Sequence, residues 1–242
     1  MPHPTDVSPV TETPPPAPRG VAISGLVFSL LFSVSLVLMR TAVSTDAAEP
    51  GQWLGDPAAR RWLGWALKLV PLCGIPFLWF LGVVRDHVGA REDKFFATVF
   101  LGSGILFVAL LYGAGAAAEA TLGSFATADP ARSSPPDLNP PPGEAQAVAG
   151  LGRRLAASLM HTFLPRMAAV FLFVASSIGL RTGTWPRGIS LAGFACGGVL
   201  LLLITESTAV LFLLPAWVLL VSTWILSNPF RDAGTKIGRA HV

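Results

Sequence analysis

The 242-residue chain has a net charge of +3, with 13% charged and 52% hydrophobic residues. Soluble domains contain about 25% charged residues, so this composition argues against a water-soluble domain and is typical of a membrane protein. The basic residues form no run, which argues against a nucleic-acid-binding surface.

Six nearly uncharged stretches follow one another along the chain, and each is long enough to cross a hydrocarbon core of about 30 Å as a helix. They are Gly20–Met39, Trp62–Val84, Phe95–Ala117, Leu164–Leu180, Gly188–Thr205 and Ala209–Leu226. The sequence therefore predicts an all-α, polytopic transmembrane bundle of six spans within residues 20–227.

The segments outside these stretches have a different composition. Residues 1–19 are rich in proline and predict a disordered tail, and a proline-rich loop is expected at about residues 118–147. The Ala/Leu-rich part Ala145–His161 can extend the fourth helix outward. Residues 228–242 form a C-terminal tail, in which Lys236–Val242 resembles the translation of a short-read sequencing adapter and is expected to be an artefact.

The orientation is predicted from Lys and Arg in the short loops, because these residues favour the cytoplasmic side. The loop Arg85–Lys94 and the loop Arg181–Arg187 are both short and basic, and they lie on the side of the two chain ends. We therefore expect both termini in the cytoplasm, and a plasma membrane, specifically a bacterial inner membrane, as the location.

Ionisable side chains in or beside spans are functional candidates, because their burial in lipid is costly. Five such residues are expected at the outer ends of the spans, and we group them as a candidate outer polar cluster. Its members are Lys68, Glu119, His161, Arg166 and Glu206. They could form an open polar pocket in which a base pairs with an acid, or each long side chain could reach its own interface.

Gly193 and Gly197 form a small-residue face on the fifth span, which permits close approach of another helix from the same chain or from a second copy. The sequence contains none of the common hydrolase, nucleotide-binding or metal motifs. We therefore expect no enzyme activity, no cofactor and no metal.

Two resemblances can be stated on particular residues. The region from Phe77 to Gly104, together with Arg166–Phe171 and Leu180–Arg187, resembles an uncharacterised family of bacterial six-helix membrane proteins, which implies six helices and no known activity. The turn with Gly82, Asp86, Gly89 and Arg91 is also similar, weakly, to the signature of the major facilitator superfamily.

The sequence indicates an integral membrane protein of unknown function, first as a small-solute permease or channel and, as the alternative, as a non-transporting scaffold or assembly partner. A small-solute permease or channel would need a polar-lined cavity near the middle of the membrane. A non-transporting scaffold or assembly partner could be packed solid and would expose a surface for other proteins.

Overall fold

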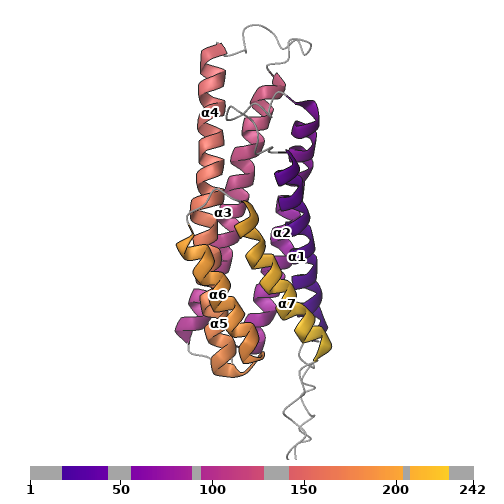
Figure 1. The fold of residues 1–242 in the computed structure, drawn as a ribbon, viewed down its shortest axis with the longest axis vertical. Helices are drawn as coiled ribbons and strands as arrows, with labels where there is room; N and C mark the ends of the chain where they lie inside the picture. The colour runs from indigo at the N-terminus through magenta and orange to yellow at the C-terminus, as the bar shows by residue number, and fades with distance from the viewer. Residues whose placement is uncertain (1–17, 43–55, 89–93, 128–141, 204–207, 229–242) are drawn as a thin grey trace, which may run out of the picture.

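The computed structural model describes residues 18–42, 56–88, 94–127, 142–203 and 208–228, and this part of the chain is helical throughout, without strands (Figure 1). The helices are α1 (Pro18–Ala42), α2 (Pro57–Val88), α3 (Lys94–Thr127), α4 (Pro142–Ser158), α5 (Leu164–Thr182), α6 (Arg187–Leu202) and α7 (Leu213–Ser227). A π-helical turn, η3 (Leu159–Phe163), joins α4 to α5, and a 3-10 turn, η4 (Thr208–Phe212), leads into α7. The predicted all-α class is confirmed for these residues.

Five helical segments are long and apolar enough to cross a membrane by length and composition: Gly20–Thr41, Pro57–Asp86, Lys94–Gly123, Ala147–Thr182 and Thr208–Ser227. The sixth predicted span corresponds to α6, which has 16 residues. At 1.5 Å per residue this helix rises about 24 Å, less than the roughly 30 Å of a hydrocarbon core. The count of six spans is therefore not confirmed, although the described part of each apolar stretch is largely helical.

Two of the helices continue well past their apolar stretches. The expected outward extension of the fourth helix is confirmed: α4, η3 and α5 form one continuous helix from Pro142 to Thr182. In Figure 1, α4 and the end of α3 run side by side above the level at which α6 and α7 meet. The tail before residue 18, residues 128–141 and the C-terminal residues 229–242, including Lys236–Val242, lie outside the described part.

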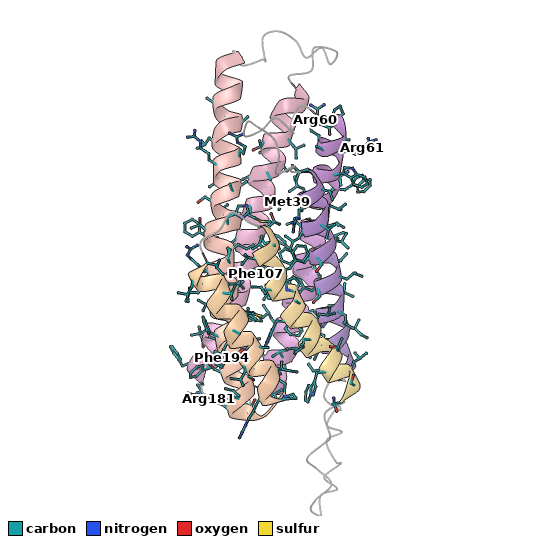
Figure 2. All side chains as sticks on the ribbon, viewed as in Figure 1. Met39, Arg60, Arg61, Phe107, Arg181 and Phe194 are labelled. Atoms are coloured by element: carbon teal, nitrogen blue, oxygen red, sulfur yellow. The ribbon has the colours of Figure 1, made fainter. Side chains whose placement is uncertain are left out.

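The helices form a closed ring, because α1 packs on α2, α2 on α3, α3 on α5, α5 on α6, α6 on α7 and α7 on α1. The middle of this ring is filled by buried aromatic side chains, which we call the aromatic core. Its members are Phe28, Phe32, Phe77, Phe80, Phe100, Phe107, Phe171 and Trp217. Figure 2 labels Phe107 at mid-height of the bundle.

Phe77 on α2 connects the helices across the aromatic core. The centre of its ring lies 4.5 Å from that of Phe28 on α1, 5.2 Å from that of Phe107 on α3 and 5.4 Å from that of Phe171 on α5. Phe171 in turn lies 6.4 Å from Trp217 on α7, edge to face. Rings at these separations contribute about 0.5–1.5 kcal/mol per pair beyond the area they bury. Since the rings are also buried, the centre of the bundle is densely packed.

The π-turn η3 has a local cause in Pro165. Proline has no backbone N–H to donate to the carbonyl four residues earlier, and its ring collides with that carbonyl in a regular α-helix. The N–H of Leu164 bonds instead to the carbonyl of Leu159, five residues back. The wider turn therefore lets the long helix continue through Pro165, which an apolar pattern does not predict.

Candidate functional site

Charged side chains mark the two ends of the bundle. Figure 2 places Arg60 and Arg61 at the end of α2 opposite to Arg181 at the end of α5. The guanidinium carbon of Arg181 lies 4.2 Å from the ring centre of Phe96 on α3, a cation–π contact. We use "outer end" for the end with Arg60 and Arg61, where the five members of the candidate outer polar cluster were expected.

Lys68 lies on an exposed face of α2, and its Nζ stands 4.8 Å from the ring centre of Trp65. Trp65 is itself 55% exposed, and Trp62, one turn earlier, is 49% exposed. Trp and Lys side chains that share an exposed helix face are typical of an anchor at a membrane–water interface. This geometry matches the alternative in which Lys68 reaches its own interface.

Arg166 and His161 lie one turn apart at the junction of η3 and α5, and both are half-buried. The guanidinium Nη1 of Arg166 donates a hydrogen bond to the backbone carbonyl of Thr162. A side chain that bonds a carbonyl of the preceding turn is held against its own helix. Arg166 thus has a local partner in the carbonyl four residues earlier, which the sequence spacing did not predict.

The two acidic members are placed differently. Glu119 is exposed on α3, and within the described residues it forms no ion pair with Lys68 or Arg166. Glu206 lies outside the described residues, so its pairing with a base is not addressed by the structure. Of the five cluster residues, the structure brings His161 and Arg166 together on one helix and keeps Lys68 on another.

The small-residue face of α6 is occupied within the chain. A Cβ atom added at Gly193 would overlap the side chains of Ser176 on α5 and Trp217 on α7. A Cβ added at Gly197 would lie 3.3 Å from the carbonyl oxygen of Ala169 on α5. The sequence left open whether the partner helix comes from the same chain or from a second copy. In the structure, both glycines contact helices of the same chain.

The feature that sequence reasoning missed is the aromatic core. Its signal was available in the spacing of Phe28 and Phe32, four residues apart, and of Phe77 and Phe80, three apart, which places each pair on one helix face. The lateral order of the helices, which brings these faces together, is not encoded in any one helix. The aromatic core therefore became visible only in the structure.

Within the described residues, the buried polar side chains other than the Trp indoles carry only hydroxyl groups and no charge. They are Ser24, Ser29, Ser35, Ser103, Thr121, Ser176, Ser190 and Ser222. Several bond to a carbonyl of their own helix, as Ser29 does to Gly25 at 2.8 Å, while Ser35 donates across to the carbonyl of Ala66 on α2 at 3.0 Å. The bond of Ser35 links α1 to α2, whereas the hydroxyl groups of Ser176, Ser190 and Ser222 have no hydrogen-bond partner within the described residues.

No group of three or more His, Cys, Asp or Glu side chains within the described part of the chain is placed to hold a metal ion. Comparison of the sequence with protein-family models finds no match, and neither does comparison with curated proteins. Comparison with solved structures also finds no match. The function is therefore argued from the geometry of this chain.

Proposed function

We propose that this chain is a non-transporting membrane scaffold, in which a solid helical bundle carries the α3–α4 hairpin beyond the lipid. The single observation that carries the proposal is the aromatic core: Phe28, Phe77, Phe107 and Phe171 meet at ring separations of 4.5–6.5 Å and are at most 1% exposed. A close-packed aromatic centre excludes water.

A permease, the other function that the sequence left open, needs polar groups that replace the hydration of a solute near the middle of the membrane. Five of the eight buried hydroxyl side chains in the described part of the chain bond to backbone carbonyls. The hydroxyl groups of Ser176, Ser190 and Ser222 have no hydrogen-bond partner there, but no charged side chain is buried beside them. The geometry therefore favours the scaffold over the permease.

The proposal includes a placement in the membrane. We propose that α6 forms a sixth, short span, since its partners α5 and α7 flank it on both sides and a bilayer can thin locally around a short helix. The charged turn after Arg181 and the end of α7 would then share the cytoplasmic face of a bacterial inner membrane. This assignment rests on the distribution of basic residues in the short loops.

The α3–α4 hairpin is the proposed assembly element. The α4 helix has 17 residues and rises about 25 Å beyond η3. Val148, Leu151 and Leu155 are 66%, 69% and 51% exposed, and their spacing of three and four residues places them on one face. Gly152, on the side of α4 that faces α3, lies against Thr121. Ala149 is only 6% exposed, and Leu151 lies about 160° from Ala149 around the helix, so the exposed residues lie on the side of α4 opposite to Ala149.

The experiment uses Cys73, which lies in the ring with an exposed fraction of 0%. Of the chain's two cysteines, Cys196 is replaced by alanine, and the protein is reconstituted in phospholipid vesicles. A charged, membrane-impermeant maleimide is then added from either side. We expect no labelling of Cys73 during prolonged incubation, because no water reaches the aromatic core around it.

A matched control establishes that the reagent works. A variant with both native cysteines replaced and Thr184→Cys in the α5–α6 turn should label rapidly, and Cys73 should label once the protein is unfolded in sodium dodecyl sulfate. Labelling of Cys73 in the folded protein by the charged reagent would reveal an aqueous path to mid-membrane. That result would overturn the scaffold proposal in favour of a permease.

A further inference from the structure

An apolar groove of about 540 Å³ runs between α1 and α2 and opens outward from the bundle. Its lining comprises Gly20, Ile23, Ser24, Val27, Leu31, Leu72, Ile75, Pro76 and Trp79. We call it the α1–α2 groove. Its only polar side chains are Ser24, whose hydroxyl already donates to the carbonyl of Val21 at 2.9 Å, and the indole of Trp79. The groove is therefore built for a hydrocarbon occupant.

Large, exposed side chains from both helices flank the groove, and the small residue Gly20 lies at its end on α1. Ile23, Ile75 and Trp79 are 55%, 58% and 67% exposed. Gly20 contributes no side chain, and a Cβ atom added there would meet nothing within 4 Å. The hollow is thus open space flanked by apolar walls, and a chain lying in it would cover surface that the helices leave uncovered.

The length of the groove decides between possible occupants. From Gly20 to Leu31 it follows eleven helical steps, or roughly 16 Å at 1.5 Å each. Half of a hydrocarbon core of about 30 Å is one leaflet. A transmembrane helix of a partner protein would need a groove that runs through the whole thickness of the hydrocarbon core. An acyl chain of a lipid occupies one leaflet, which matches the length of this groove.

The position of the groove agrees with this length. Its Gly20 end lies at the beginning of the membrane-crossing segment Gly20–Thr41, and its Leu31 end lies at the middle of that segment. An acyl chain that enters beside the first turn of α1 would therefore run from the interface to the bilayer centre. We propose that the α1–α2 groove binds one acyl chain of a phospholipid in the leaflet next to the N-terminus of α1.

This site needs only that α1 and α2 cross a bilayer, and it is independent of whether the protein is a scaffold. The probe is a phosphatidylcholine that carries a photoreactive diazirine in one acyl chain. It is added in a small molar excess to the full-length protein in detergent micelles, and the labelled peptides are identified by mass spectrometry. We expect label on residues 20–31 and 72–79, several-fold above the label on the exposed Leu219 and Leu220 of α7.

The test variant is Gly20→Leu, which fills one end of the groove from an open position. Each methylene that is displaced from an apolar contact weakens binding about fourfold, so the loss of two such contacts should lower labelling of the groove about sixteenfold. Gly102→Leu on α3 is the matched control, because Gly102 is exposed and a Cβ there also meets nothing within 4 Å. It should leave the labelling unchanged.

Four results would overturn the proposal. Label that follows the exposed area of all helices, or equal labelling of the two glycine variants, would make the groove ordinary lipid-facing surface. Label concentrated on Val34 and Val37, in the other half of α1, would contradict the single-leaflet position. If Gly20→Leu does not fold, Ile75→Trp fills the groove from α2 and gives the same readout. If neither the groove nor α7 were labelled, the result would contradict the membrane placement itself.

Discussion

The hydroxyl of Tyr112 on α3 donates a hydrogen bond to the backbone carbonyl of Pro71 on α2, with an O–O distance of 2.9 Å. Pro71 and Pro76 both lie inside α2 and remove two donors from its backbone ladder. The aromatic ring of Tyr112 also covers Gly74, where a Cβ atom would overlap it. Tyr112 thus supports α2 from outside between the carbonyls of Leu67 and Leu72, which Pro71 and Pro76 leave without their helical donors.

Tyr112→Phe should lower the stability of the bundle while leaving its fold intact. The change removes one interhelical hydrogen bond and keeps the ring on Gly74, and such bonds between membrane helices contribute about 0.6–1.7 kcal/mol. Thermal unfolding in detergent should therefore show a lower midpoint. Thr223→Val is the control, since the hydroxyl of Thr223 bonds only to carbonyls of its own helix α7. Equal effects of the two variants would show that the Tyr112 bond contributes nothing specific.

Gly193→Ala should destabilise the contact of α5, α6 and α7. The added methyl group would overlap Ser176 and Trp217, and Trp217 is fixed because its indole N–H donates to the carbonyl of Ile189 at 3.0 Å. Overpacking of this kind costs about 1–3 kcal/mol. The measurement is again the thermal midpoint in detergent.

Gly198→Ala provides the matched control for this change. Gly198 lies on the same helix, and a Cβ there would meet nothing within 4 Å, so only the gain in helix propensity remains. A Gly193→Ala variant as stable as Gly198→Ala would contradict the close approach of α5 and α6 at this glycine.

The sixth span can be tested by sidedness of labelling. In a background without native cysteines, Leu203→Cys at the end of α6 should react with an impermeant maleimide from outside intact cells. Thr184→Cys, at the other end of α6, should react only after the inner face is exposed. We expect this because the two positions flank α6. Reaction of both from one side would show that α6 does not cross the membrane.

The axial layout of this chain follows from its sequence, and the lateral layout does not. Apolar runs such as Gly20–Met39 predict helices because lipid requires every backbone polar group to be bonded within its own segment. Accordingly, α1 occupies Pro18–Ala42. The order in which the helices surround Phe77 depends on how whole faces fit together, and no single run of residues contains that information.

In the candidate site, too, the sequence predicts local properties and does not predict contacts. The sequence indicated which charged residues lie beside spans, such as Lys68 and Arg166, because charge and hydropathy are local properties. It could not indicate that Lys68 stacks on Trp65 or that Arg166 bonds the carbonyl of Thr162. The bond of Arg166 lies at the junction of the π-turn with α5, and a period of 3.6 residues gives no sign of that turn.

The last prediction concerns self-association of the proposed scaffold through α4. Copies in one membrane share their orientation, so the exposed residues Val148, Leu151 and Leu155 of two copies lie at the same height and can meet around a two-fold axis. Their spacing is that of a short coiled-coil seam. In a background without native cysteines, Leu151→Cys should therefore form a disulfide-linked dimer in oxidised membranes, seen on a non-reducing gel.

Ala157→Cys is the control for this experiment. Ala157 is also exposed on α4 but points about 120° away from Leu151 around the helix, so it should remain monomeric under the same oxidation. Leu155→Glu, added to Leu151→Cys, should abolish the dimer, because a pair of like charges would then face each other in the seam. Equal crosslinking at positions 151 and 157 would indicate random collision, and the scaffold would then require a different contact surface.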